Sequence, residues 1–306
     1  TSADAIYVQE PDNSSKNHRS LIERKIANAS GAGAKLHCLT GRARRWTADH
    51  GEPAVRTLLA LFLFWSAHSL AEQPVLRFSV AESWSMPLIR IENGQPVEGL
   101  LFDVMEAAAK QAGARPEYHV MARMRLEEAM NQGDIDVRCY VSDQWLMARP
   151  KDFIWSVPLI HQRDVLVGRL GEGGPISPQR LSPQPIGTVL GYTYTTLEPL
   201  LAAHRLYRED SRSQELALQK LQAGRYRYAV SNQLSLRWFN HQRHAQLQPL
   251  AVLDEQDLGC LVRNDPDIPA QALLRALVRI KQSGEMERLL QRYGSTEEPP
   301  PTGTGT

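Results

Sequence analysis

An arginine at a change of chain direction is the first candidate for chemistry in this sequence. Arg149 precedes Pro150 and lies between two strand-like segments. Residues 135–141 alternate apolar and polar side chains, and residues 153–157 are aromatic and β-branched. Loops carried on a rigid sheet are where binding groups usually lie. The pattern therefore predicts a binding role for Arg149, and Arg138 on the first strand is the second choice.

The turn at residues 191–196 is the second candidate. It follows a strand-like run, residues 185–190, and leads into a helix predicted from about residue 195 to residue 204. Gly191, Thr193 and the helix N-terminus together indicate an anion site, because free backbone N–H groups and the positive end of the helix dipole point outward there. An ordinary strand–helix turn capped by threonine is the alternative.

Composition and the missing motifs narrow the function. The chain has 306 residues, 42% of them hydrophobic and 23% charged, which suits two compact domains or one bilobed protein. A net charge of +1 argues against a nucleic-acid binder. We find no nucleophile elbow, metalloprotease motif, Walker loop or dinucleotide fingerprint, and the three cysteines lack zinc spacing. The sequence therefore predicts neither a cofactor nor a metal, and it points away from an enzyme.

One apolar run near the N-terminal end indicates export. Residues 58–67 are too short to span a bilayer, are preceded by Arg56 and are followed by small residues that end at Ala71. Residues 55–71 therefore read as a signal peptide, which implies a periplasmic protein. A buried helix, or twin-arginine export through Arg44-Arg45, is the alternative.

The two chain ends are predicted to lie outside the folded part. Residues 1–54 are polar and lack sustained periodicity, and we interpret them as upstream sequence ahead of a start at Val55. Residues 295–306 are rich in Pro, Gly and Thr, a composition typical of disorder.

The order of segments resembles the extracellular solute-binding proteins of family 3, the polar-amino-acid-binding type. In that family a Gly-x-x-Asp turn and strand lead to a Ser/Thr-rich loop, an arginine and, six residues later, Phe-Ser-x-Pro-Tyr. Here Asp136, Ser142 and Arg149 take these places, and the Trp-Ser-Val-Pro-Leu run begins at Trp155. The interval from Asp136 to Arg149 is one residue longer than usual. The resemblance covers about residues 76–293.

The resemblance implies a bilobed α/β fold of the periplasmic-binding-protein type II. Lobe 1 would comprise residues 74–158 plus 257–294, and lobe 2 residues 162–250, with two crossing strands between them. The ligand would lie between the lobes and hold them closed. In this fold Cys139 and Cys260 lie on neighbouring strands of lobe 1, which favours a disulfide in an oxidising compartment. Two buried free thiols are the alternative.

The resemblance also implies a set of ligand-binding residues. They are Trp84, Tyr140, Ser142, Arg149, Gly191, Tyr192, Thr193 and Asn232. Arg149 would hold a carboxylate, Trp84 and Tyr140 would form aromatic walls, and the loop at Gly191 would donate hydrogen bonds from lobe 2. For Trp84, packing in the core is the alternative.

Two of these positions depart from the family pattern. Tyr192 interrupts its Gly-Ser/Thr-Thr loop, and Asn232 stands where the family has an aspartate that binds an α-ammonium. A carboxylate contributes roughly 1.5–3 kcal/mol to such a bond and a neutral amide nearer 1 kcal/mol. Asn232 therefore disfavours an ordinary α-amino acid. We interpret Arg123 and Arg125 as a solvated face, with the rim of the cleft as the alternative. We interpret Glu82 as a solvated carboxylate at a strand end, with contact to a ligand ammonium as the alternative.

Three functions follow. The first is a monomeric periplasmic protein that captures a small, polar, carboxylate-bearing solute for an ABC importer. The second is a ligand sensor that acts on a membrane signalling partner. The third is a dehydratase-like enzyme with Glu82 as its general acid. That enzyme needs a carboxylate with a raised pKa between the lobes, and Asn232 argues against it.

Overall fold

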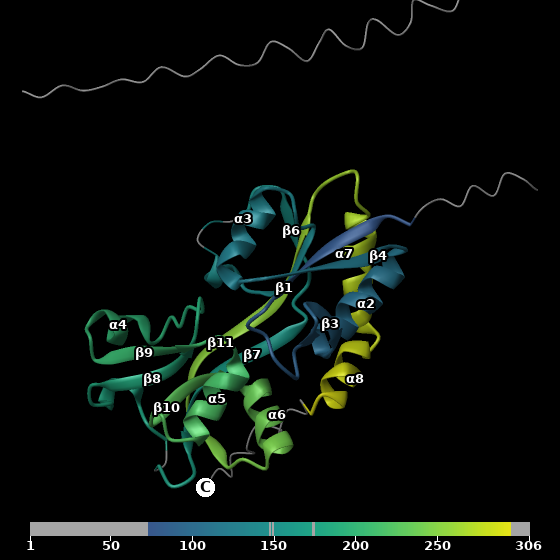
Figure 1. Cartoon of the computed structure of the whole chain (residues 1–306). Coiled ribbons are helices and arrows are strands. Elements are labelled where there is room, and N and C mark those ends of the chain that lie inside the picture. The colour runs from purple at the N-terminus through teal and green to yellow at the C-terminus, as the bar shows by residue number, and fades with distance from the viewer. Residues whose placement is uncertain (1–72, 147, 149, 173–174, 295–306) are drawn as a thin grey trace, which may run out of the picture. The chain divides into compact units, whose positions relative to one another are not determined.

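The computed structural model describes residues 73–146, 148, 150–172 and 175–294, all of which fall in the unit Leu70–Thr306. The predicted signal peptide, the segment before it, the C-terminal tail and Arg149 lie outside the described residues. The main chain forms two α/β lobes (Figure 1). Lobe 1 below means residues 74–158 and 257–294, and lobe 2 means residues 162–250.

The sheet of lobe 1 is built on three parallel strands in the order β4-β1-β5. They are β1 (Val75–Ala81), β4 (Arg115–Met121) and β5 (Val137–Val141). The C-terminal part of β11 (Leu247–Arg263) pairs antiparallel with β5 and with the short β6 (Phe153–Trp155). A hairpin of β2 (Arg90–Glu92) and β3 (Gln95–Glu98) stands apart from this sheet.

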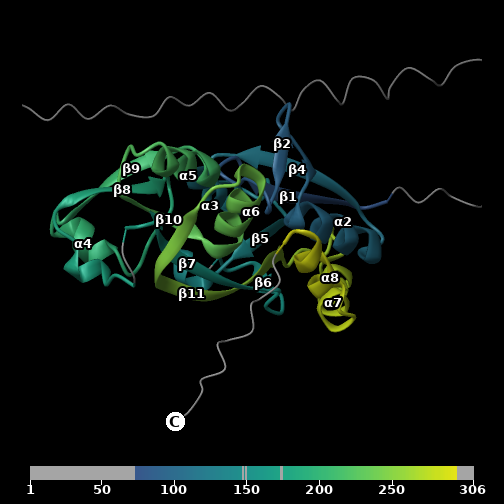
Figure 2. The same cartoon turned by 90° about the horizontal axis from the view of Figure 1, so that it is seen from below.

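Helices cover both faces of this sheet. On one face lie α2 (Leu100–Ala112), α7 (Ala270–Gln282) and α8 (Glu285–Arg292), which share one apolar core with β1. Figure 2 shows these three helices together at one end of the described chain. On the other face lie the 3-10 turn Arg123–Arg125 and α3 (Leu126–Asn131). Apolar residues at helical spacing bury α2, and Gly113 ends it in the left-handed region at φ 73°.

Lobe 2 repeats the strand order of lobe 1. Its parallel strands are β8 (Gln184–Val189), β9 (Leu206–Ser211) and β10 (Tyr228–Asn232), in the order β9-β8-β10. The antiparallel neighbour of β10 is β7 (Ile160–Arg169). Its helices are α4 (Glu198–Ala202), α5 (Gln214–Gln222) and α6 (Gln233–Arg243), with a 3-10 turn at Pro178–Arg180. The apolar core around α4 is separate from the core around α5 and α6.

Two long antiparallel strands connect the lobes. β7 and β11 pair from Ile160 opposite Leu258 to Arg169 opposite Leu247. This ribbon continues the hydrogen-bonded path from one lobe to the other, so the described strands form one sheet order, β4-β1-β5-β11-β7-β10-β8-β9. Both strands cross between the lobes, as the sequence predicted.

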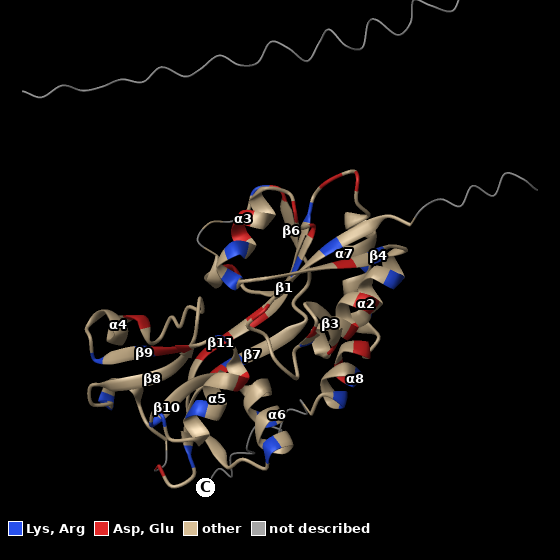
Figure 3. Ribbon diagram, viewed as in Figure 1, with Lys and Arg blue, Asp and Glu red and all other residues tan. Residues whose placement is uncertain are grey.

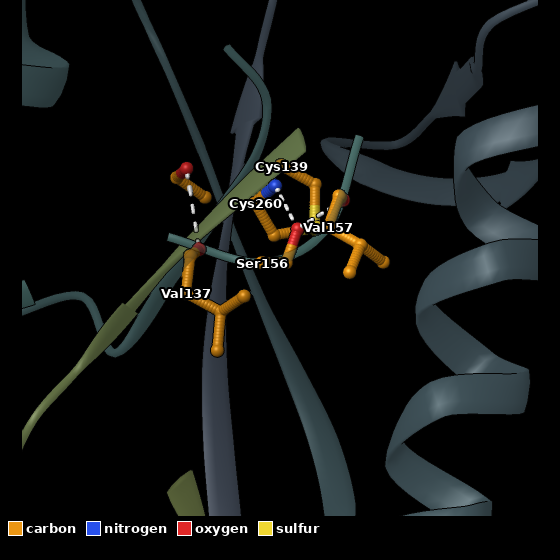
Figure 4. Close-up of a disulfide and its surroundings, with 6 residues drawn as sticks. Val137, Cys139, Ser156, Val157 and Cys260 are labelled. Atoms are coloured by element: carbon orange, nitrogen blue, oxygen red, sulfur yellow. Dashed lines mark hydrogen bonds between the residues drawn. A yellow bond between two sulfur atoms is a disulfide. The ribbon is translucent and has the colours of Figure 1, made fainter. Parts of the chain in front are cut away.

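A disulfide joins β5 to β11 in lobe 1. The Sγ atoms of Cys139 and Cys260 lie 2.03 Å apart, and the two residues are opposite each other in the strand register (Figure 4). Beside the bridge, the Ser156 hydroxyl accepts a hydrogen bond from the Cys260 amide at 2.8 Å and donates one to the Val157 carbonyl at 2.8 Å. The pairing is the one that the resemblance implied.

A buried carboxylate fixes the turn that precedes β5. Asp136 is 1% exposed and accepts hydrogen bonds from the backbone and the guanidinium of Arg77 on β1, and it pairs with Arg263 on β11 at 2.7 Å. Burial alone would raise the pKa of Asp136, but its bonds to Arg77 hold that pKa below the ordinary value. The Gly-x-x-Asp turn therefore has a structural role, because it ties three neighbouring strands together.

Candidate functional site

The ribbon between the lobes has one polar inner face. In the strand register Gln162 and Asp164 of β7 lie opposite Gln256 and Asp254 of β11, and Asn232 of β10 lies on the other side of Asp164. Residues directly opposite each other in paired strands point to the same face of the sheet. The five side chains therefore gather on one face of the ribbon. The alternate residues carry exposed ion pairs, His161–Asp257 and Arg163–Glu255, on the opposite face. Acidic residues of this ribbon are drawn red in Figure 3.

A chain of hydrogen bonds runs from lobe 1 into this inner face. Tyr140, the residue before the last of β5, has a positive φ of 58°, and its hydroxyl donates to Gln162 Oε1. Gln162 Nε2 in turn donates to Asp164 Oδ1 at 2.8 Å. Burial, and then the charge of Asp254, raise the pKa of Asp164 to about 7, while Gln162 and Arg123 act in the opposite direction.

Asp254 is held by the loop that precedes α4. The Thr196 hydroxyl lies 2.9 Å from Asp254 Oδ1 and 2.6 Å from the Leu253 carbonyl oxygen, and its single proton can serve only one of them at a time. The Thr196 amide is 3.4 Å from Asp254 Oδ2. Asp254 therefore retains acceptor capacity beside Asp164.

Arg123 connects the two lobes. Its guanidinium carbon lies 5.1 Å from the ring centroid of Trp145 in lobe 1 and 4.8 Å from that of Tyr192 in lobe 2. Its Nε donates to the Gly191 carbonyl at 3.2 Å. The prediction that Arg123 belongs to a solvated face is wrong, because aromatic rings from both lobes cover it. Its neighbour Arg125 is exposed, as predicted.

The predicted aromatic walls meet one another. Trp84 packs edge-on against Tyr140, with ring centroids 5.8 Å apart, and belongs to the core of lobe 1. The Trp84 indole N–H is buried without a hydrogen-bond partner. The neighbouring Ser83 hydroxyl donates to the Tyr192 hydroxyl at 3.3 Å, which is a further direct contact between the lobes. Glu82 is exposed, in keeping with a solvated carboxylate.

Arg138 is a buried cation that forms no ion pair with any described residue. It is 4% exposed, and its guanidinium donates to the Met130 sulfur at 3.9 Å. Glu127 is near enough for its charge to act on Arg138. Burial, followed by the nearby charge of Arg123, lowers the pKa of Arg138 to about 10. Charged side chains are rarely buried without a partner. Arg149, the first choice from the sequence, lies outside the described residues.

The loop of lobe 2 differs from its prediction. Gly191 turns in the left-handed region at φ 76°, but α4 starts at Glu198 instead of about residue 195 and has only five residues. No helix N-terminus therefore follows Thr193, whose side chain is exposed. The loop reaches the interlobe region through Tyr192 and the Gly191 carbonyl. This carbonyl accepts a hydrogen bond and cannot donate one to an anion.

Two further predicted residues act as helix caps. The Asn232 side-chain oxygen accepts from the Ser235 amide at 2.7 Å and so caps α6. The Ser142 hydroxyl accepts from the Gln144 amide at 3.3 Å and caps the 3-10 turn Asp143–Trp145. Both side chains are buried, and both are located beside the strand ends that face the interlobe region.

A cavity of about 280 Å³ opens between the lobes near these residues. Ser85 and Met86 line it from lobe 1, and Ser235, Trp238 and Phe239 line it from lobe 2. Among the described residues, the hydroxyl oxygens of Ser85 and Ser235 are buried without a hydrogen-bond partner. Charged side chains, including Arg90, Glu98 and Arg243, also line the cavity, so it combines apolar surface, charges and unused polar atoms.

Metal-binding clusters and membrane-spanning helices are both absent from the described ranges. No cluster of three or more His, Cys, Asp or Glu side chains there could hold a metal ion. Within the same ranges, no helix has the length and apolar character needed to cross a membrane.

The two lobes, the crossing strands and the polar residues between them define a bilobed solute-binding protein of the α/β class. Comparison with protein families agrees. The profile of the bacterial extracellular solute-binding proteins, family 3, matches residues 76–296, and the chain belongs to that family. A search of curated proteins found no match.

Solved structures show the same fold at low sequence identity. A mutant of ArgBP from T. maritima aligns with a TM-score of 0.59 and 20% identity, over 73% of this chain and 96% of that one. A substrate-binding protein of an amino acid ABC transporter aligns at 0.56 and 19%, over 72% and 100% of the two chains. The ancestral amino-acid-binding protein AncCDT-1, a precursor of cyclohexadienyl dehydratase, aligns at 0.56 and 18%, over 72% and 95%.

Proposed function

We propose that the protein captures a small, amino-acid-like solute that carries a carboxylate and delivers it to an ABC importer from the periplasm. Membership of the solute-binding family supports the class of function. One of the aligned structures is the binding protein of an amino acid ABC transporter, which supports the choice of partner.

The proposal that the ligand has a carboxylate rests on two arginines near the interlobe region whose positive charge is unbalanced. Arg138 is buried without an ion pair among the described residues, and Arg123 contacts only aromatic rings and a carbonyl. A ligand carboxylate compensates a buried guanidinium through charge-assisted hydrogen bonds. Arg149 remains our first choice for direct contact because of its place in the motif order of the sequence, and Arg138 remains the second.

The test is ligand binding to the purified protein. A thermal-shift screen with L-glutamate, L-arginine, glutarate and agmatine identifies the ligand class, because a ligand at a hundred times its dissociation constant stabilises the folded state by about 2.7 kcal/mol. Titration calorimetry then compares Arg149→Ala and Arg138→Met with the exposed control Arg125→Met.

The proposal requires that at least one of the first two substitutions weakens the binding of a carboxylate ligand. Arg149→Ala abolishes tight binding if Arg149 contacts the carboxylate directly, and Arg138→Met does so if Arg138 takes that role. Arg125→Met leaves affinity unchanged. If neither Arg149→Ala nor Arg138→Met changes the dissociation constant of a carboxylate ligand, the assignment of the carboxylate is refuted.

Delivery to an importer is tested in cells. Uptake of the radiolabelled ligand should fall in cells that lack the protein and recover when it is restored. Unchanged uptake, together with a changed transcriptional response to the ligand, would instead support the ligand sensor.

One observation favours an enzyme as the second candidate. The site contains a half-buried carboxyl group, Asp164, whose pKa is raised to about 7, so it is a possible general acid at neutral pH. AncCDT-1 has the same fold and is an amino-acid-binding protein that was the precursor of cyclohexadienyl dehydratase. Mass spectrometry of the ligand after incubation with the protein decides between the two: loss of water means an enzyme, and an unchanged ligand means a binding protein.

A further inference from the structure

Asn232 is a weak partner for an ammonium group, because it carries no charge and one lone pair of its side-chain oxygen is already used within the protein. Its side-chain oxygen accepts the Ser235 amide at 2.7 Å as the N-cap of α6, an eleven-residue helix. The remaining polar atom of the side chain is the amide nitrogen, which only donates hydrogen bonds. Moving the oxygen towards a ligand would leave the helix N-terminus uncapped, at a cost of about 1 kcal/mol.

A carboxylate lies one strand away from that position. Asp164 on β7 is directly opposite Asn232 on β10, so both side chains extend from the same face of the sheet. Neighbouring strands are separated by about 4.8 Å. A ligand that binds beside Asn232 can therefore reach Asp164 with a small shift of its amino group.

The surroundings of Asp164 offer acceptors in excess of donors. Asp164 receives one hydrogen bond, from Gln162, and forms no ion pair with any described residue. Asp254 lies opposite it as a second carboxylate. Gln256, which is 6% exposed, has a buried Oε1 atom without a hydrogen-bond partner on the same inner face. Acceptors that keep unused capacity after these bonds are suited to a group that only donates.

The positive charge of Arg123 does not satisfy these unused acceptors. Arg123 is close enough to lower the pKa of Asp164, but its guanidinium stacks between two aromatic rings and donates to Gly191. Burial and the repulsion from Asp254 remain the larger effects on Asp164. A ligand cation beside Asp164 would relieve both, because it restores the interactions that the carboxylate loses on leaving water.

We infer that the ligand's ammonium binds Asp164, with Gln256 Oε1 and Asp254 as further acceptors, and that the carboxylate found at the Asn232 position in this family has been replaced by one on the adjacent strand. The inference rests on the proposed capture of an amino-acid-like solute and adds the site of its amino group. It also removes the objection that Asn232 raised against an α-amino acid.

Two pairs of probes separate the amino group from the carboxylate. Glutarate is L-glutamate without its amino group, so this pair isolates the amino group, and agmatine is L-arginine without its carboxylate, so that pair isolates the carboxylate. Titration calorimetry on the full chain at pH 8 compares these probes on the wild type, Asp164→Asn, Asn232→Asp and the double variant that exchanges the two residues. The matched control is Asp257→Asn, because Asp257 lies on the outer face of the same ribbon, where it pairs with His161.

The expected result is a loss of affinity that depends on the amino group. Asp164→Asn should weaken the better-bound amino acid by about 10- to 100-fold, as expected for a charge-assisted bond. It should leave glutarate nearly unchanged, and the exchange variant should recover part of the loss for the amino acid. Asp257→Asn should bind like the wild type.

Two results would overturn the inference in different ways. If the wild type prefers an amino acid to its deaminated partner and Asp164→Asn keeps that preference, the ammonium does not bind Asp164, although solute capture stands. If the wild type binds none of the four probes, capture of an amino-acid-like solute is itself contradicted and the inference falls with it.

Discussion

Replacing Asp164 by asparagine should stabilise the ligand-free protein at alkaline pH. An aspartate with an ordinary pKa of 3.8 in the unfolded chain and a pKa of about 7 in the folded one binds its proton more tightly when folded. Between these two values the unfolded chain has released the proton and the folded protein has not. The free energy of unfolding therefore falls as the pH rises through this range and stays low above it.

The pKa difference sets the size of the effect. About three pKa units at about 1.4 kcal/mol each give an upper value of about 4 kcal/mol, and the coupling to Asp254 makes about 2–4 kcal/mol the expected range. Asparagine keeps the shape and an acceptor for Gln162 but carries no charge. The stability difference should thus be largest above pH 7 and should shrink towards pH 4.

Urea unfolding of both proteins between pH 4 and pH 9 measures this directly. The prediction is two curves that approach each other at low pH and separate as the pH rises, with the variant more stable. Parallel curves would refute a half-buried, titrating Asp164. The same variant is expected to bind an amino acid less well, so a gain of stability with a loss of affinity excludes misfolding as the cause.

Three other substitutions test the framework of the site. Replacing Cys139 and Cys260 by serine opens a loop of sequence separation 121 and should lower the free energy of unfolding by up to about 5 kcal/mol, seen as a lower urea midpoint; an unchanged midpoint would contradict the bridge. Gly187→Ala would overlap the Tyr226 ring and should cost about 1–3 kcal/mol in the same assay, and full stability would show that the ring can move away. Arg123→Ala removes about 2–3 kcal/mol of interlobe contact and should increase the radius of gyration of the ligand-free protein in X-ray scattering, whereas an unchanged radius would show that other contacts hold the lobes.

The fold could be predicted because its signals are local or follow from chain order. The alternating side chains of residues 135–141 correspond to β5, and the two crossing strands of the implied fold correspond to β7 and β11. The family profile matches residues 76–296, close to the 76–293 taken from the order of motifs. The start of a helix was harder to predict where no capping residue marks it. Leu197, the N-cap of α4, forms no side-chain hydrogen bond to the helix, and the predicted start was three residues too early.

The chemistry between the lobes was largely missed, because it depends on pairing between distant segments. Asp164 and Gln162 looked like ordinary polar residues in a crossing strand, and Asp254 and Gln256 like ordinary residues in another. A signal was present: both strands place polar side chains two residues apart, and antiparallel pairing brings such positions to one face. Arg123 was assigned to solvent because no local pattern shows that Tyr192, 69 residues away, would cover it.

The disulfide also sets an order of events during synthesis and export. Cys139 emerges 121 residues ahead of Cys260, and lobe 2 lies entirely within that interval. Lobe 2 has its own strands, helices and apolar cores, so it can fold while lobe 1 still lacks the C-terminal part of β11 and the helices α7 and α8. The native bridge therefore cannot form until almost the whole chain has been made. A chain cut short after lobe 2 would keep the Cys139 thiol free, available to an oxidoreductase or to a wrong partner.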